Sequence, residues 1–411
     1  MKLSTLGFLS TAVCALATSG ALADCGIKSG SVRVLSNDFP ALHAVNDGAA
    51  ACASNSVEIT INQTADHNDI QVAALTANPA QYTVAVVANS SIVSLMNDDL
   101  IRPLDDLVER FGSGLSPSQM IKVDGQIMAI AFMANAQHLF YRADILSEVG
   151  VEPPKTYEEV LAAANAIRSA NLMENPFTFN SKAGWNLAEE FVNMYLGYGG
   201  EFFEPSSAQP SINNAKGVAA LNMLRSLTEY ASPDFLTLDS TATTAQWESG
   251  EAALATLWGS QGAAILDDTG STSEIVANTL LIGAPTVGGG DIPASTLWWD
   301  GFTIAKNISD EDAEASFLAM LNGISPENIS ANNDKAVWLS NAFKPGPTAV
   351  GVAETGKGGA KPYPMIPYMG ILHGAIGENL SEFLQGTESA EQALSDIEDA
   401  YIAAAQEQGF L

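Results

Sequence analysis

Apolar and polar positions alternate with two different periods along the first part of the chain. Residues 31–35, 57–61 and 82–87 are short apolar or alternating runs that predict strands, and the last is apolar enough to be covered on both faces. Residues 41–53 and 68–77 carry apolar side chains at helical spacing. Strands that alternate with helices form βαβ units, so this pattern predicts a mostly parallel sheet flanked by helices.

A stretch in the middle of the chain has the clearest element boundaries. The apolar runs 126–132 and 138–141 predict two strands separated by a polar break. Thr156 then precedes a helical pattern, and Glu159 stands where its side chain can reach back to the cap. This capping box predicts that a helix begins directly after Thr156.

The second half of the chain is mainly helical in pattern. Residues 185–195, 213–230 and 389–404 place apolar side chains on one helical face. The glycine-rich segment 283–290 predicts a loop, and 298–302 leads into a further strand.

An ordered set of motifs surrounds the two central strands. Its members are Asp124-Gly125, Phe132, Tyr141-Arg142-Ala143-Asp144, Gly150 and Pro153-Pro154-Lys155-Thr156-Tyr157-Glu158-Glu159. This order resembles family 1 of the extracellular solute-binding proteins of ABC transporters, the maltose-binding-protein-like family. Segments 100–108 and 243–256 also resemble segments of that family, so the resemblance covers nearly all of the chain beyond residue 23.

The resemblance implies an α/β, two-lobed periplasmic-binding-protein fold. Each lobe is expected to be a mostly parallel sheet flanked by helices, with a ligand cleft between the lobes. The expected division assigns residues 24–135 and 287–325 to lobe 1, and 136–286 and 326–411 to lobe 2. The resemblance also implies a small solute as ligand, an ABC transporter permease in the inner membrane as partner, and a monomer.

The first residues have the features of an export signal. Lys2 is followed by a mostly apolar run, 6–16, and Ala21-Leu22-Ala23 fits a cleavage site. These features predict a signal peptide at 1–23 that is cleaved after Ala23, and therefore a periplasmic protein. Asp24 precedes Cys25, and a lipid-anchored cysteine would follow a small residue, so we expect free export.

The cysteines agree with an oxidising compartment. Cys25 and Cys52 remain as an even pair beyond the signal. A disulfide closing the loop between them would stabilise the domain by roughly 3.5 kcal/mol in the chain-entropy model. The alternative is that both remain unpaired buried thiols. No other cysteine or histidine lies at metal-ligand spacing from either of them, so a metal site is not expected.

The net charge and the absence of catalytic motifs argue against several classes of function. The formal net charge of −30 argues against nucleic acid or an anionic membrane as partner, because either needs a basic patch. The sequence has no HExxH, GxSxG, Walker A, dinucleotide or CxxC motif, so neither an enzyme nor a cofactor is expected. A secreted carbohydrate-active enzyme stays open as an alternative, since two carboxylates from distant segments can flank a glycosidic bond.

Tryptophans are the leading ligand candidates, because their rings match the apolar faces of a sugar. Trp258 ends an apolar run, at a position where a matching tryptophan faces the ligand in sugar-binding relatives. Trp298 and Trp299 are adjacent, so one should face the cleft and the other should pack, with Asp300 as a hydroxyl acceptor. Trp185 begins a predicted helix, and a position in the cleft and a position in the core are equally expected for its ring. Trp247 lies inside a helical pattern and is expected in the core. For Trp338 the sequence does not decide between core and cleft.

Polar candidates come from the first lobe and from the crossing between the lobes. Asp38 and Phe39 follow the first strand, and Asn89 follows the third, where open α/β sheets bind ligands. Phe132, Asn135 and Gln137 lie at the crossing. For each polar residue a loop or capping role is the alternative.

The pattern favours a neutral ligand. The chain has few arginines and none in a segment expected to line the cleft, whereas a buried anion would need one. A small neutral carbohydrate, from monosaccharide to oligosaccharide, glycoside or polyol, fits best. A cationic amine or polyamine held by tryptophans and carboxylates is the rival ligand class.

Overall fold

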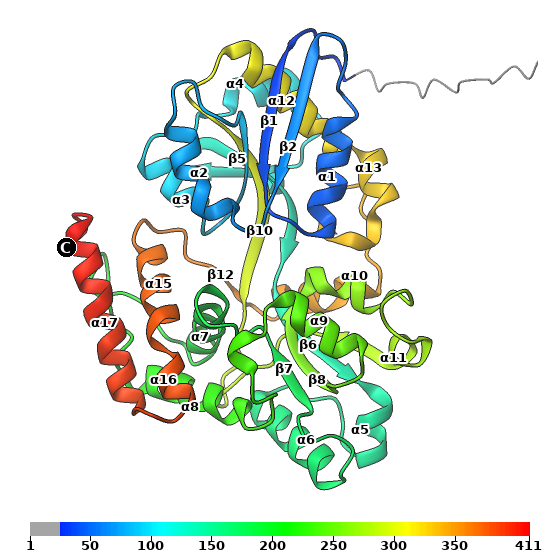
Figure 1. Cartoon of the computed structure of the whole chain (residues 1–411), viewed down its shortest axis with the longest axis vertical. Coiled ribbons are helices and arrows are strands. Elements are labelled where there is room, and N and C mark those ends of the chain that lie inside the picture. The colour runs from blue at the N-terminus through cyan, green and yellow to red at the C-terminus, as the bar shows by residue number, and fades with distance from the viewer. Residues whose placement is uncertain (1–24) are drawn as a thin grey trace, which may run out of the picture.

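The computed structural model describes residues 25–411, and the expected signal peptide lies outside them. The chain forms two lobes, each around its own sheet, and Figure 1 shows them one above the other. The larger sheet has eight strands and the smaller has four. Each lobe has its own apolar core, as the size of the chain leads one to expect.

The lobe around the larger sheet, the first lobe, is built from both halves of the chain. Its elements are β1 (Gly30–Ser36), α1 (Pro40–Ala50), β2 (Val57–Gln63), α2 (His67–Thr76), β3 (Val84–Ala88), α3 (Ile92–Asn97), α4 (Asp105–Phe111), β4 (Met120–Val123), β5 (Gln126–Asn135), β10 (Thr296–Ile304), α12 (Asp310–Gly323), α13 (Pro326–Ala331), β11 (Val337–Trp338) and β12 (Lys361–Pro362).

The second lobe contains the smaller sheet and most of the helices. Its elements are β6 (Gln137–Arg142), α5 (Ala143–Val149), α6 (Tyr157–Ser169), β7 (Phe177–Phe179), α7 (Trp185–Gly197), α8 (Ala215–Thr228), α9 (Ser240–Glu248), β8 (Leu254–Trp258), α10 (Gly262–Ile265), α11 (Ser273–Asn278), β9 (Thr279–Ile282), α14 (Val350–Lys357), α15 (Met369–Asn379), α16 (Ser381–Leu384) and α17 (Ala390–Glu407).

The two-lobed α/β fold is confirmed, but both sheets are mixed. In the first lobe β1 pairs in parallel with β2 and β3, as the alternating pattern predicts. Strand β10 returns from the second lobe and inserts antiparallel between β3 and β5. In the second lobe β6 is antiparallel to both β8 and β9, and only β7 and β8 are parallel. A mostly parallel sheet is therefore correct only for β1, β2 and β3.

Apart from β12, whose two residues pair with the start of β10, the chain crosses between the lobes three times. It passes from β5 directly into β6, returns from β9 into β10, and leaves β11 for α14, which packs on β6 and β9. Figure 1 shows β10 extending from the first lobe toward the second. Because α13 packs on α1 and β11 pairs with β5, we propose that residues 326–343 group with the first lobe.

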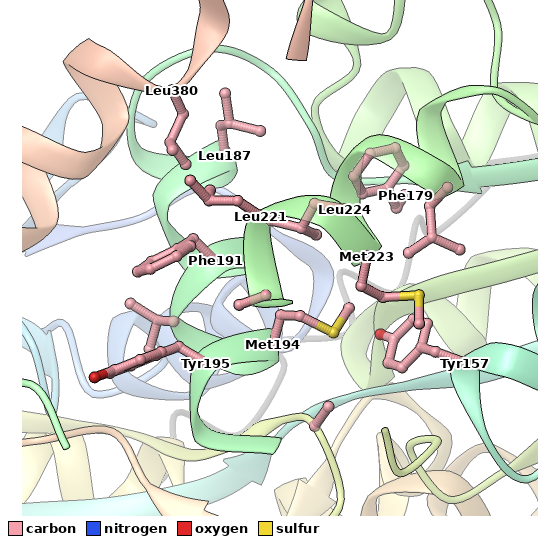
Figure 2. Packing of buried hydrophobic residues seen from close by; sticks show 14 of the residues in the cluster. Tyr157, Phe179, Leu187, Phe191, Met194, Tyr195, Leu221, Met223, Leu224 and Leu380 are labelled. Atoms are coloured by element: carbon pink, nitrogen blue, oxygen red, sulfur yellow. The ribbon is translucent and has the colours of Figure 1, made fainter. Parts of the chain in front are cut away.

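Apolar helix faces fill the core of the second lobe. Figure 2 shows Leu187, Phe191 and Tyr195 of α7 beside Leu221 and Leu224 of α8. Helix α7 is buried around most of its circumference. A helix buried in this way is normally apolar on all sides, so the polar residues within α7 require partners.

Two local predictions are confirmed. The hydroxyl of Thr156 accepts from the Glu159 amide at 3.1 Å, and the Glu159 carboxylate accepts from the Thr156 amide at 3.2 Å. Cys25 and Cys52 form a disulfide that closes a separation of 27 residues. Between residues 25 and 411, none of the helices has the length and apolar character needed to cross a bilayer.

Candidate functional site

Three tryptophans from separate segments meet where the lobes join. Trp185 begins α7, Trp258 ends β8 and Trp298 lies near the start of β10. The Trp258 and Trp298 ring centroids are 5.7 Å apart, and Trp185 lies 6.4 Å from Trp258 and 5.6 Å from Trp298. The structure therefore brings together three of the four tryptophans proposed from the sequence.

Tyr363 and His373 extend this cluster, and sequence reasoning missed both. Tyr363 lies 4.4 Å from the Trp298 ring and His373 lies 4.8 Å from the Trp185 ring. We call Trp185, Trp258, Trp298, Tyr363 and His373 the aromatic group. Tyr363 follows α14 and β12, in a stretch whose sequence shows no clear periodicity, so only its tertiary contacts identify it.

The histidine of the aromatic group is uncharged at neutral pH. Its Nε2 lies 2.9 Å from the Trp185 carbonyl, which only accepts, so Nε2 carries the proton. Nδ1 then accepts from the Tyr363 hydroxyl at 3.0 Å. Burial lowers the pKa of His373 to about 4. All five side chains thus present an uncharged surface.

Exposure differs sharply within the group. Trp185 is 42% exposed although its ring is large and apolar, whereas Trp298 is only 6% exposed. Trp258 is partly exposed. A solute can therefore reach Trp185 and Trp258 in this conformation, while Trp298 supports them from behind.

Trp298 and Trp299 face opposite ways, as their adjacency in a strand predicts. Trp298 joins the aromatic group, and Trp299 packs against a first-lobe cluster that includes Ala85 and Val87. Trp299 is partly buried. The aromatic group and the ring of Trp299 therefore belong to different surfaces of β10.

Asp300 is partly buried beside this strand. It pairs with Ala88 of β3 and Met133 of β5, at a bulge in the β10–β5 register. Burial raises the pKa of Asp300 to about 7. Its carboxyl group is thus divided between neutral and charged forms at neutral pH, and it is able to donate as well as accept a hydrogen bond.

The amide side chains proposed from the sequence have protein partners. Asn89 donates to the Leu297 carbonyl at 3.0 Å and accepts from the Trp299 amide at 3.3 Å. Asn135 binds the hydroxyl and backbone of Ser260, which follows β8. Gln137 donates to Glu190 at 2.9 Å and accepts from Asn193 at 3.1 Å. In this conformation Asn89 binds β10, Asn135 binds the residue that follows the end of β8, and Gln137 binds α7.

The remaining candidates lie apart from the aromatic group. Phe132 is fully buried in the core of the first lobe, so its side chain offers a solute no surface here. Asp38 is exposed, and its Oδ1 atom lies 2.5 Å from Nε2 of His43, which is also exposed. Phe39 packs partly on the first-lobe core.

The two other tryptophans belong to cores. Trp247 is fully buried and donates to the Thr279 hydroxyl at 3.0 Å, which confirms the expectation from its helical pattern. Trp338 is 3% exposed and donates to the Asn332 carbonyl. Neither indole contacts the aromatic group.

The arginines of the described chain are engaged away from the aromatic group. Four of them pair with carboxylates: Arg102 with Asp310, Arg110 with Glu314, Arg142 with Asp144 and Arg168 with Glu174. Arg33 donates to backbone carbonyls and Arg225 lies over the Phe383 ring. Among residues 25–411, no cluster of histidine, cysteine and carboxylate side chains has the arrangement of a metal site.

Comparison with known proteins gives the family context. The family model described as bacterial extracellular solute-binding protein matches residues 49–332, more than half of the chain. A probable ABC transporter-binding protein of Deinococcus radiodurans is 29% identical over 203 residues. That match covers 48% of this chain and 47% of the relative, so it spans about half the length of each.

Solved structures share the fold over nearly the whole chain. Maltose-bound MalE3 of T. maritima superposes with a TM-score of 0.78 at 19% identity, covering 92% of this chain and 100% of that one. An ABC transporter solute-binding protein of Agrobacterium radiobacter K84 in complex with ribitol gives 0.78 at 19% identity, with 92% and 98% coverage. One from Agrobacterium vitis S4 with bound D-mannitol gives 0.76 at 15% identity, with 93% and 99% coverage. At these identities the likeness is one of fold.

Proposed function

Because the chain belongs to the bacterial extracellular solute-binding proteins, we propose that it is the receptor of an ABC importer and binds a small neutral carbohydrate or polyol between its lobes. Members of this family bind solutes and are not enzymes. The proposed receptor works in the periplasm as a monomer and delivers its ligand to a permease in the inner membrane.

One observation carries the choice of ligand: an uncharged aromatic surface is exposed where the lobes join. Trp185 is 42% exposed, and its neighbours Trp258 and Trp298 support it at ring distances below 6.5 Å. Aromatic rings bind the C–H faces of sugars and polyols, which offer no charge. Three structural neighbours bind maltose, ribitol and D-mannitol, which supports this class.

Polar groups next to the aromatic surface suit hydroxyls better than an anion. Asp300 lies two residues along β10 from Trp298 and can both donate and accept at neutral pH. Arginine, the usual partner of a buried anion, is absent from the aromatic group. A neutral solute with several hydroxyls can therefore contact the aromatic rings through its C–H faces and Asp300 through a hydroxyl.

Binding is proposed to close the lobes by hinge motion at the three crossings. Only contacts that are better in the closed state can shift the population toward closure. In the proposed closed state, Asp38, Phe39 and Asp300 from the first lobe approach the second-lobe tryptophans around one ligand, while Trp299 stays packed on the other surface of β10.

A thermal-shift screen with maltose, ribitol and D-mannitol tests the ligand class directly. A bound ligand raises the melting temperature by mass action. Trp258→Ala should then weaken binding roughly tenfold or more in calorimetry, because it removes an aromatic contact. Trp338→Phe, in the core of the first lobe, is the control and should bind as the parent does. Equal affinities for Trp258→Ala and the parent would contradict the proposed site.

A cationic amine is the second candidate, and Asp300 is the observation that favours it. A partly buried carboxyl beside tryptophans also fits an ammonium group. Added salt should weaken binding of spermidine, whereas binding of a sugar should be indifferent to salt. A melting-temperature increase with spermidine alone would replace the carbohydrate proposal.

A further inference from the structure

Two adjacent glutamates are buried inside α7 without a cation. Glu189 is 0% exposed and Glu190 is 3% exposed. No ion pair found among residues 25–411 includes either of them. Buried carboxylates are normally paired, because an isolated charge is costly to remove from water. These two carboxyl groups therefore need another explanation.

Glu189 lies directly behind the aromatic group. The Trp298 indole N–H donates to Glu189 Oε1 at 3.0 Å and to the Thr296 hydroxyl at 2.7 Å. The Thr296 hydroxyl contacts Glu189 Oε1 as well, and it lies 2.8 Å from Asn193 Oδ1. The orientation of the Trp298 ring thus depends on a small polar cluster of which Glu189 is the centre.

The number of protons available in this cluster shows whether the Glu189 carboxyl group is protonated. The Asn193 amide is fixed, since its Oδ1 accepts from the Thr296 backbone at 2.7 Å and its Nδ2 donates to Gln137. The Thr296 hydroxyl has one proton and two neighbours, Asn193 Oδ1 and Glu189, that accept if Glu189 is ionised. One of these contacts therefore requires a proton from the Glu189 carboxyl group.

The surroundings favour the same uncharged form. Burial raises the pKa of Glu189 to about 8, and the hydrogen bonds from Thr296 and Trp298 lower it only in part. Burial also raises the pKa of Glu190 well above its ordinary value. The titratable groups that face the pair are Tyr157 from α6, toward Glu190, and Tyr363, toward Glu189. Burial raises the pKa of both tyrosines, so neither is charged at neutral pH.

The other elements packed on α7 also supply no cation. Helix α8 presents Leu221 and Leu224 to the opposite face of α7, as Figure 2 shows. His373 of α15 reaches this region through the Tyr363 hydroxyl, and burial keeps it neutral. An ionised Glu189 would thus be a buried charge with hydrogen-bond donors but no cation beside it.

The same cluster joins two of the strands that cross between the lobes. Gln137, the first residue of β6, binds Glu190 and Asn193. Thr296, the first residue of β10, binds Glu189 and Asn193. One face of α7 therefore connects the aromatic group at Trp185 to both strand starts.

Resting on the proposed function, we propose that Glu189 is a positioning residue that holds the Trp298 indole for the bound solute as an uncharged carboxylic acid. Loss of its proton removes the donor to Thr296 and places a charge behind the ring. The solute site is then disordered and its affinity falls, although Glu189 itself does not touch the solute.

Tryptophan spectra test this role without any ligand. The mature protein, Glu189→Gln and Glu190→Gln are compared by near-ultraviolet circular dichroism between about pH 6.5 and pH 9. The parent should show a tryptophan transition with a midpoint of about 8. Glu189→Gln cannot ionise, so its spectrum should stay constant. Glu190→Gln, the matched buried control that does not contact the indole, should keep the transition. A parent spectrum that is constant, or an unchanged transition in Glu189→Gln, would overturn the proposal.

Calorimetry with maltose, ribitol and D-mannitol adds the binding readout. For the parent, affinity should fall roughly tenfold between pH 6.5 and pH 9, as expected when only the protonated form binds. Glu189→Gln should bind within about threefold of the parent at pH 6.5 and lose the pH dependence. If none of these solutes binds, the ligand proposal fails for them while the spectra still decide the role of Glu189. If binding is equally pH-dependent in both proteins, the positioning role is refuted and the ligand proposal stands.

Discussion

At the scale of single residues, the tryptophans divide by what surrounds their rings. Trp185 and Trp258 have partly exposed rings in the aromatic group, while Trp247 has no exposed surface and its N–H bonds within the core. Burial of an aromatic ring stabilises the fold, whereas an exposed ring contributes little until a ligand covers it. Substitutions of the two kinds should therefore affect different measurements.

Trp185→Ala is expected to impair binding rather than folding. Because the ring is 42% exposed, the free energy of unfolding should fall by less than about 1 kcal/mol, while affinity for a bound sugar should fall roughly tenfold. Trp247→Ala should cost about 3–5 kcal/mol of stability, as large core truncations do. Urea unfolding and calorimetry measure the two effects. Equal losses of stability in the two variants would argue against an exposed Trp185.

Glu189 should impose a pH dependence on stability as well as on binding. Its pKa is raised from 4.5 to about 8, so the folded state binds the proton more tightly than the unfolded state does. The stability it contributes is complete below about pH 4.5 and is lost as pH rises toward 8. Glu189→Gln should remove this loss and be more stable than the parent by on the order of 3 kcal/mol at pH 7. Urea unfolding at pH 5 and pH 8 measures the difference, and parallel curves for both proteins would contradict it.

Residue types indicated the aromatic part of the site better than the polar part. A tryptophan at a strand end has few roles, and Trp258 and Trp298 lie together although their strands belong to different sheets. The amides of Asn89 and Gln137 bind residues that the chain supplies much later. Which amide is already occupied depends on the register between distant segments, and local sequence does not carry that information.

At the scale of elements, helices with a local signal were predictable. Helix α6 follows its capping box, and α17 follows Ser389, whose hydroxyl accepts from the Gln392 amide. These signals involve residues three positions apart, so they can be recognised without the fold. The direction of β10 depends on where the chain returns, and alternation of strands and helices did not reveal that it runs antiparallel.

Helix α14 allows a paired test of packing at a crossing. A Cβ on Gly351 would lie 2.1 Å from Nδ1 of His138, whose ring is stacked on Phe140. Gly351→Ala should therefore destabilise the protein by roughly 1–3 kcal/mol through overpacking. In the same helix, a Cβ on Gly356 meets only Leu297 at 3.9 Å. Gly356→Ala should stabilise by about 0.5–1 kcal/mol through helix propensity. Thermal unfolding measures both, and changes of the same sign would refute the packing argument.

At the scale of the whole molecule, the disulfide fastens the start of the described chain to the end of α1. Cys52 is 5% exposed within the first-lobe core. Reduction should lower the free energy of unfolding by roughly 3.5 kcal/mol, because the unfolded chain regains the entropy of the loop. Denaturant unfolding with and without dithiothreitol measures this loss. A double variant, Cys25→Ser with Cys52→Ser, should not respond to the reductant, and a parent equally unresponsive would contradict the prediction.

The position of β10 in the larger sheet also determines when that sheet can form during synthesis of the chain. This strand lies between β3 and β5, yet it is translated after the whole of the first sheet's other long strands. A gap in the middle of the sheet exposes unpaired backbone groups on both sides, so the sheet cannot close until residue 304 has left the ribosome. For the export proposed here, this delay keeps the first sheet open while the chain passes through a membrane.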